Sequence, residues 1–176
     1  MGRGVERHGT NSSAHFDYQR SAQSKFCPHI RAIEKAAAGL NITTSVAEVR
    51  DRTEIDQAIR LHEPSIDTGL IILPGPVPAR HRAYISDLAA QKKFPAVYPY
   101  RYFVTGGGLV SYGIDTVDVF RQAATYVDRI LRGEAPGDLP IQAPTKFEMV
   151  LNLKTAKALE LQIPPMLLAR ADEVIE

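Results

Sequence analysis

The sequence predicts an α/β fold built on a Rossmann-like parallel sheet, and two observations support this prediction. Residues 69–74, GLIILP, form a continuous apolar run of the kind found in parallel strands that are covered on both faces. Segments with helical periodicity alternate with short strand-like segments from residue 18 to residue 98. This alternation implies right-handed crossover connections, which make neighbouring strands parallel.

The elements of this first part follow from residue type and spacing. Ile30, Ile33 and Ala37 recur at helical spacing before Gly39, which supplies a stop. Residues 1–15 are polar and without period, so we expect a disordered arm there. The expected elements are, in order, a helix over residues 18–40, a strand over 42–49, a helix that starts at 51–54, a strand over 69–74, a helix over 79–93 and a strand over 94–98.

The second part continues with a different set of elements. Gly133 ends an amphipathic helix, and residues 134–144 carry three prolines and one glycine, which is typical of a connector. The expected elements are an extended segment over residues 109–112, a helix over 115–131, a strand over 146–151, a short helix over 152–159 and a last helical turn over 167–171.

The most unusual stretch is residues 98–113, YPYRYFVTGGGLVSYG. It holds five of the 13 Phe and Tyr residues of the chain, next to three consecutive glycines. Glycines allow close approach to the main chain, and flat rings with polar tips suit a small organic ligand. The stretch has neither the phosphate-loop pattern nor the dinucleotide-binding pattern, so a nucleotide site is not expected.

Composition excludes several functions. The net charge of +1, from 21 Lys and Arg against 20 Asp and Glu, gives no basic field for nucleic acid. Cys27 is the single cysteine, so an internal disulfide is excluded, and the histidines show no metal-ligand spacing. We therefore expect no cofactor and no metal. No run of 18 apolar residues exists, and residues 1–15 lack the apolar core of a secretory signal, which taken literally predicts a cytoplasmic chain.

Three long runs resemble a known family. They are residues 94–113, FPAVYPYRYFVTGGGLVSYG, residues 118–140, DVFRQAATYVDRILRGEAPGDLP, and residues 142–176, QAPTKFEMVLNLKTAKALELQIPPMLLARADEVIE. Together they resemble the periplasmic substrate-binding proteins of ABC transporters, in particular the family related to tryptophan and tyrosine uptake. The resemblance extends from about residue 16 to the end. It implies a type I periplasmic binding protein, in which two Rossmann-like lobes close on a solute that a membrane permease then takes up, and it implies no catalysis.

The resemblance also implies how this chain is organised. Family members are roughly twice as long, so residues 16–176 would be a single carboxy-terminal lobe. Residues 108–131 would be a crossover segment belonging to an absent lobe, and residues 146–176 a return strand and terminal helix. The lobe's first strand is not visible in residues 1–15, which would leave the sheet one strand short. The crossover helix would lack the sheet that covers its apolar face. We therefore expect it either to repack onto the remaining lobe or to associate with a second copy in a homo-oligomer. Glu160 stands where relatives commonly place glycine.

The candidate ligand-binding residues lie where predicted strands end, because open α/β sheets bind ligands at the carboxyl ends of their strands. The first strand end offers a weak anchor, since Gly75 replaces an acidic residue that many relatives carry. The second offers rings, backbone N–H groups and Arg101 for a carboxylate. The candidates are Pro74, Gly75, Tyr98, Tyr100, Arg101, Gly107, Gly108, Ser111 and Tyr112.

Each candidate also has a simpler interpretation. Buried rings are mostly packing, and an exposed Arg is mostly solvated. Cys27 and His29 are two residues apart, which on a helix points them to different faces and argues against a catalytic pair. We expect a solute-binding component with negligible affinity as an isolated lobe. The alternative is a small cytoplasmic α/β enzyme or regulatory domain that uses the glycine loop for a sugar or nucleotide.

Overall fold

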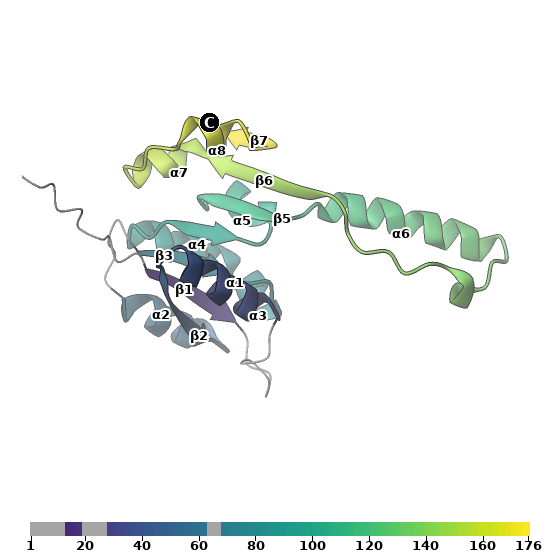
Figure 1. The fold of residues 1–176 in the computed structure, drawn as a ribbon, viewed down its shortest axis with the longest axis horizontal. Helices are drawn as coiled ribbons and strands as arrows, with labels where there is room; N and C mark the ends of the chain where they lie inside the picture. Colours follow the sequence, from purple (N-terminus) through teal and green to yellow (C-terminus); the bar gives the residue numbers. More distant parts are fainter. Residues whose placement is uncertain (1–12, 19–27, 63–67) are drawn as a thin grey trace, which may run out of the picture. The chain divides into compact units, whose positions relative to one another are not determined.

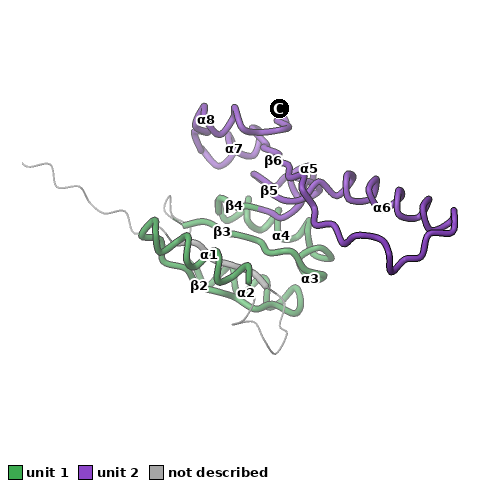
Figure 2. Tube along the Cα trace, turned by 45° about the vertical axis from the view of Figure 1, so that its right-hand side comes forward, with its two compact units in different colours: residues 1–97 green, residues 98–176 purple. Residues whose placement is uncertain are grey.

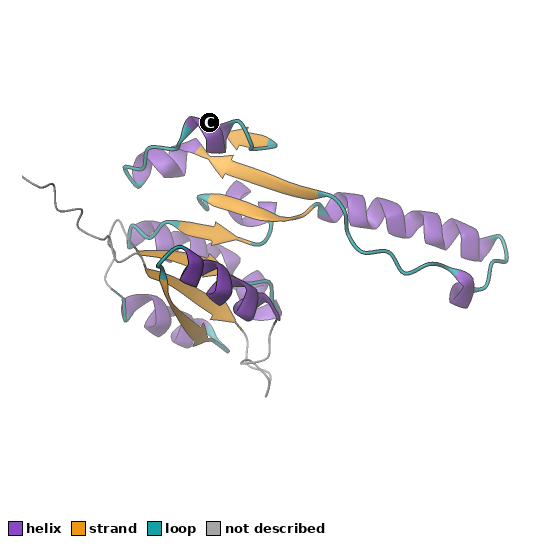
Figure 3. Cartoon of the chain, viewed as in Figure 1, coloured by secondary structure: helices purple, strands orange, loops and turns teal. Residues whose placement is uncertain are grey.

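The computed structural model describes residues 13–18, 28–62 and 68–176, with only the backbone of residues 13–18 (Figure 1). The chain divides into two compact units, residues 1–97 and 98–176 (Figure 2). Unit 1 alternates strands and helices in the described part, as the sequence predicts (Figure 3). Unit 2 contains the aromatic and glycine-rich stretch and everything after it.

Unit 1 is a parallel sheet with helices between its strands. The strand order is β2-β1-β3-β4, and every neighbouring pair is parallel. This confirms the predicted α/β class with its parallel sheet. The elements are β1 Ser13–Tyr18, α1 Pro28–Gly39, β2 Thr43–Glu48, α2 Arg52–Arg60, β3 Thr68–Ile72, α3 Pro76–Arg80, α4 Arg82–Gln91 and β4 Ala96–Tyr98.

The first strand corrects the sequence analysis. We expected no strand in residues 1–15 and a sheet one strand short, but β1 lies between β2 and β3, with Ser13 opposite both Thr43 and Thr68. A six-residue segment of mixed polarity gives little signal of its own, and its strand conformation depends on parallel partners on both sides. The first helix begins at Pro28 and not near residue 18, because proline fixes the backbone angle of a first helical turn. The remaining arm residues and Cys27 lie outside the described residues.

The core of unit 1 forms where β3 meets the helices. Alternate residues of β3 are buried, including Leu70 and Ile72, and the helices contribute further buried aliphatic side chains. The helices α2 and α4 also meet through polar groups at the surface. The Tyr84 hydroxyl donates a 2.6 Å hydrogen bond to Asp56, and the Arg52 guanidinium lies 4.0 Å from the centre of the Tyr84 ring. Bonds from Arg60 and then Tyr84 lower the pKa of Asp56.

Unit 2 is arranged around a short mixed sheet. β5 pairs antiparallel with β6, and β6 pairs parallel with β7. The aromatic stretch, which we expected to be a loop, contains a short helix, and β7 was not predicted because three residues become a strand only by pairing with β6. The elements are α5 Arg101–Thr105, β5 Val110–Ile114, α6 Thr116–Leu131, the 3-10 turn Pro136–Asp138, β6 Phe147–Asn152, α7 Leu153–Ala158, α8 Pro165–Leu168 and β7 Glu173–Ile175.

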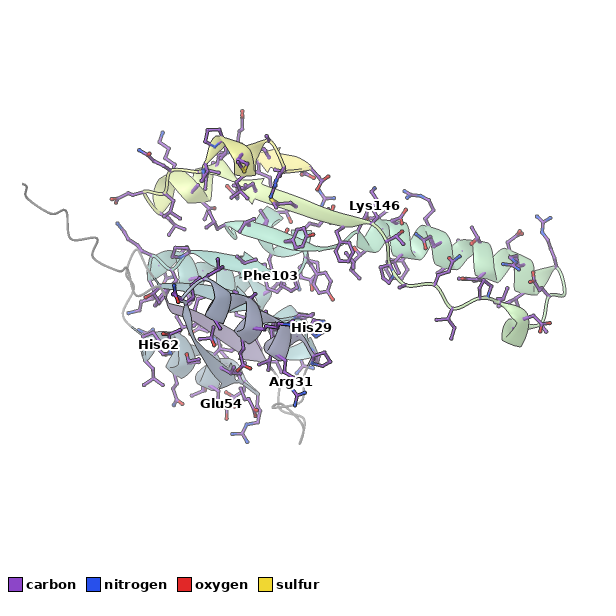
Figure 4. The ribbon with its side chains drawn as sticks, in the orientation of Figure 1. His29, Arg31, Glu54, His62, Phe103 and Lys146 are labelled. Atoms are coloured by element: carbon purple, nitrogen blue, oxygen red, sulfur yellow. The ribbon has the colours of Figure 1, made fainter. Side chains whose placement is uncertain are left out.

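The start of α6 is tied to the start of β6. Asp115 caps the helix by accepting from the Asp118 N–H at 3.0 Å, and its other oxygen lies 2.8 Å from Lys146 Nζ (Figure 4). The bond from Lys146 is the main reason why the pKa of Asp115 is lowered. The backbone N–H of Asp115 also donates to the Lys146 carbonyl at 3.0 Å. These contacts fix where the helix leaves the sheet.

Three helices end in a left-handed residue that is not glycine. Asn41, Lys93 and Glu160 have φ of 55°, 56° and 59°. In each case the N–H of the following residue bonds back into the helix, as Leu161 does to the Ala156 carbonyl at 2.9 Å. The third case is the position at which the sequence analysis expected glycine. Glu160 adopts a conformation that glycine adopts without steric strain.

We predict that Glu160→Gly stabilises the chain by up to about 1 kcal/mol, because the helix cap stays and the left-handed strain is removed. Urea denaturation followed by circular dichroism measures the change. Glu34→Gly, in the interior of α1, is the matched control and should cost about 1 kcal/mol. Equal losses in both variants would contradict the role given to the left-handed cap.

Candidate functional site

Four rings of unit 2 form a continuous stack, here called the aromatic stack. Tyr98 lies over Phe103 with centroids 5.0 Å apart, Phe103 over Tyr102 at 5.0 Å, and Tyr102 over Tyr100 at 5.3 Å. The interplanar angles are 17° to 25°. Tyr98 is 2% exposed and Phe103 is buried, whereas Tyr100 is half-buried and Tyr102 is exposed. The stack therefore runs from the core to the surface, and its outer rings are accessible to a ligand.

The helix α5 carries the middle of this stack and is fixed from the other side. The Asn152 side chain donates to the Val104 carbonyl at 3.3 Å, and the Thr155 hydroxyl donates to the Gly107 carbonyl at 2.9 Å. Both donors come from the junction of β6 and α7. Asn152 lies on the face of β6 that α5 covers. Because α5 carries two of the rings, Asn152 and Thr155 help to fix the rings, although both residues lie 48 positions later in the chain than the groups they bind.

The glycine triplet serves packing in this structure. Gly107 has φ of 106°, a left-handed conformation that favours glycine. Gly108 is buried, and a Cβ there would lie 2.6 Å from Tyr98 Cε2 and 2.9 Å from the Phe103 carbonyl oxygen. The triplet thus lets the chain turn beneath the aromatic stack. Tyr98 and Gly108, two of the candidate ligand contacts, are brought together here and pack on each other.

Gly113 marks the opposite end of β5. A Cβ at this position would lie 1.9 Å from the Pro99 carbonyl oxygen, so the backbone of residues 99–101 runs directly over the strand. Gly108 and Gly113 are about 17 Å apart along an extended chain. The glycine triplet follows the five-residue helix α5 directly, and a Cβ on Gly106 would lie 3.3 Å from the Tyr102 carbonyl oxygen. Its grouping with Tyr100 and Arg101 in one mouth stays a prediction.

The candidates Ser111 and Tyr112 lie on opposite faces of β5, because successive strand residues alternate. Ser111 is 1% exposed on the face covered by α5, and its hydroxyl has no hydrogen-bond partner among the described residues. Tyr112 is 59% exposed on the other face, where its ring stacks on Phe147 with centroids 6.1 Å apart. These two side chains cannot line the same side of one pocket.

A group of three charged residues, here called the charge cluster, lies beside the outer end of the aromatic stack. Arg101 forms an ion pair with Glu173 of β7. Glu148 of β6 lies opposite Gly113 and shares a sheet face with Glu173. Burial raises the pKa of Glu148, which the positive charge of Arg101 partly opposes. The Arg101 Nε atom is buried without a hydrogen-bond partner among the described residues.

Sequence reasoning selected Arg101 but missed Glu148 and Glu173. One signal was available: residues 146–151 alternate polar and apolar, which places Glu148 and the buried Val150 on the same face of a strand. That a charged residue shares the covered face is unusual and could have been noted. Glu173 gave no signal, because its strand was not predicted.

Two of the candidates, Pro74 and Gly75, belong to unit 1. Pro74 is half-buried after Leu73, and Gly75 is the N-cap residue of α3, with an extended φ of 179°. A Cβ on Gly75 would make an ordinary contact with the Pro78 ring at 3.5 Å. The backbone at this position therefore has room for a residue with a side chain. Gly75 itself offers no side-chain anchor for a ligand.

Comparison with known proteins decides the family. The sequence matches the family described as ABC transporter substrate binding protein over residues 19–175. The chain belongs to this family. In the described part of the chain, no helix is long and apolar enough to cross a membrane, and no group of three or more metal-ligating side chains is found. The family consists of binding proteins, which favours binding over the small enzyme considered from the glycine loop.

One curated relative is similar in sequence, and two solved structures share the fold. A tyrosine-binding protein of Clostridioides difficile (strain R20291) is 28% identical over 116 residues, which are 62% of this chain and 32% of that protein. A conserved domain protein from Vibrio cholerae has a TM-score of 0.78 at 23% identity, covering 93% of this chain and 54% of its own. An ABC domain in complex with L-Trp from Streptococcus pneumonia has a TM-score of 0.79 at 21% identity, covering 93% and 56%. This ABC substrate-binding chain thus spans a third to about half the length of these relatives.

We predict that Gly113→Ala destabilises unit 2 by at least about 3 kcal/mol, because the new methyl group would overlap the Pro99 carbonyl and move the segment that carries Arg101. Thermal and urea unfolding measure the loss. Gly137→Ala is the control, since no atom lies within 4 Å of a Cβ there and the change should stay within about 0.5 kcal/mol. Similar stability of the two variants would show that Pro99 does not approach Gly113 in this way.

We also predict that Glu148→Gln stabilises the chain at pH 7 but not at pH 3. The raised pKa of Glu148 means that stability is lost as the pH rises from the ordinary Glu pKa through the raised folded value. Glutamine stays neutral, so the variant does not lose this stability at pH values above the raised pKa. Below the ordinary Glu pKa both side chains are neutral, and the stability should change little. Melting temperatures across pH 3–8 test the expectation, and a gain that is independent of pH would contradict it. Glu34→Gln, on the exposed side of α1, controls for the lost charge.

Proposed function

We propose that this chain forms one side of an amino-acid site in the solute-binding component of an ABC importer. The family match over residues 19–175 carries the proposal. The relative named for tyrosine binding and the structural neighbour solved with L-Trp support an aromatic amino acid as the solute. The importer would capture the solute in the periplasm, between two lobes, and pass it to a membrane permease. Residues 108–131 would cross to the second lobe and residues 146–176 would return.

The charge cluster supports recognition of a zwitterion. Arg101 can bind a carboxylate through its guanidinium, whose Nε is buried and without a partner among the described residues. Glu148 can accept from an ammonium group, and its raised pKa reflects a carboxylate that is desolvated without a counter-ion of its own. Glu173 holds Arg101 in place through their ion pair. Opposite charges at one edge of the sheet match the two charged ends of an amino acid.

The aromatic stack supports the choice of side chain. Tyr100 is half-buried and follows β4 directly, next to Arg101 in the chain. An aromatic solute would extend the stack by one more ring. Tyr98 and Gly108 then act beneath the site, where they hold the stack in position. Pro74, Gly75, Gly107, Ser111 and Tyr112 stay candidates for contacts from other sides of a closed site.

The proposal is tested by saturation-transfer NMR of the chain with L-Trp at millimolar concentration. The chain contains no Trp, so every indole signal belongs to the ligand. We expect weak binding without a thermal shift, because one lobe covers only part of the ligand surface. L-Trp should receive more saturation than tryptamine, which lacks the carboxylate, and more than indole-3-propionate, which lacks the ammonium group.

Two variants test which residue recognises the carboxylate of the ligand and which recognises its ammonium group. Arg101→Gln should abolish the preference for L-Trp over tryptamine, and Glu148→Gln the preference over indole-3-propionate. Arg80→Gln, an exposed arginine of α3, is the matched control and should leave both preferences unchanged. Equal saturation of all three ligands by the unaltered chain, or unchanged preferences in both cluster variants, would refute the proposed site.

A further inference from the structure

The arginine of the charge cluster is already paired with a carboxylate of the chain itself. Arg101 is the first residue of α5 and Glu173 is the first residue of β7, 72 positions later. The ion pair joins Nη2 of the guanidinium to Oε2 of Glu173. A glutamate side chain ends in the same group as the carboxylate of a free amino acid. Glu173 therefore occupies a position that the proposed site needs for its ligand.

This ion pair lies at the surface of unit 2. The side chains of Arg101 and Glu173 are 39% and 45% exposed. An ion pair with this exposure is weak, because water competes for both partners and screens their attraction. When the pair opens, the Glu173 carboxylate can be solvated at once, and a carboxylate from solution can reach the guanidinium.

The strand β7 keeps its place when the ion pair opens. Its three residues pair with β6 through the backbone, with Glu173 opposite Val150. Asp172, just before the strand, accepts from the Met149 N–H at 2.8 Å and donates its own N–H to the Met149 carbonyl at 2.9 Å. The exchange of one carboxylate for another at Arg101 therefore needs only a side-chain rotation of Glu173.

The charges of the cluster favour exchange over sharing. Glu148 already acts on the guanidinium through its charge, so two carboxylates lie near one arginine. A ligand carboxylate that bound with Glu173 still in place would bring a third. Like charges placed this close repel one another. Release of Glu173 into solvent removes that repulsion, while Glu148 stays to face the ammonium group.

From the exposed ion pair and the anchored strand, we infer that Glu173 competes with the solute carboxylate for Arg101. Glu173 holds the guanidinium in place in the empty site and leaves it when the solute binds. This inference rests on the proposed function and adds a self-inhibiting contact to it. The apparent affinity for the solute is lowered by the fraction of molecules in which Arg101 is still paired with Glu173.

Glu173→Gln and Glu173→Ala test this competition. Each variant removes the competing charge, and neither should unfold the chain, because Glu173 is exposed and its ion pair is weak. Dissociation constants come from the shifts of the chain's NMR signals during titration. The constants for L-Trp and indole-3-propionate should fall about two- to sixfold. The constant for tryptamine, which has no carboxylate, should not fall.

Two controls separate competition from a general change in charge. Glu176→Gln removes an exposed acid three positions later and should leave all three dissociation constants unchanged. In an Arg101→Gln background, Glu173→Gln should have no effect on indole-3-propionate, because the group for which the two carboxylates compete is gone. Equal gains from Glu176→Gln and Glu173→Gln, or the same gain without Arg101, would overturn the inference.

The outcomes also distinguish this inference from the proposed function. If the unaltered chain prefers L-Trp to tryptamine and to indole-3-propionate, but the Glu173 variants bind L-Trp equally or more weakly, Glu173 only positions Arg101. The proposed site then stands and the competition is disproved. If neither the unaltered chain nor the Glu173 variants bind L-Trp, the proposed function fails, and the competition fails with it.

Discussion

The close approach of the Pro99 backbone to Gly113 is the constraint on which unit 2 depends. A carbonyl oxygen occupies the space where every other residue would place its Cβ, so the strand and the segment above it can pack only with glycine at this position. The contact sets the height of α5 over β5. That height in turn allows Asn152 to reach the Val104 carbonyl from below. The positions of Arg101 and of the rings therefore depend on this backbone contact together with the hydrogen bonds from Asn152 and Thr155.

The same packing divides the aromatic residues into two roles. Tyr98 and Phe103, which is a residue of α5, are buried and their stacked rings fill the core, while Tyr100 and Tyr102 continue the stack outward. The charged residues gather at the outer end because β6 and β7 bring Glu148 and Glu173 to the face that carries Arg101. A partly buried acid such as Glu148, next to an arginine that already pairs with Glu173, costs stability because its charge is desolvated. In the proposed binding role, the Glu148 carboxylate would instead pair with a positively charged group of the ligand.

The helix α6 is held by local interactions in place of burial. Asp115 and Lys146 fix its start, Arg129 and Glu134 fix its end, and ion pairs one turn apart line its polar side. Such pairs each contribute little in water. The apolar face of α6 is therefore the part of the helix that depends most on being covered.

The sequence by itself determined the α/β class, three of the parallel strands of unit 1 (β2, β3 and β4), most helices and the family. These depend on local periodicity and on long matching runs, which are properties of the chain in one dimension. It also identified Arg101 and the aromatic stretch. It did not determine β1 or β7, because short strands without strong propensity form only when a neighbour supplies hydrogen bonds. Only the tertiary structure packed the Tyr98 ring on Gly108 and brought Glu148 and Glu173 to the sheet face beside Arg101. These contacts depend on strand pairing between residues far apart in the chain. The spacing of residues in the sequence does not predict which of them become neighbours across a sheet.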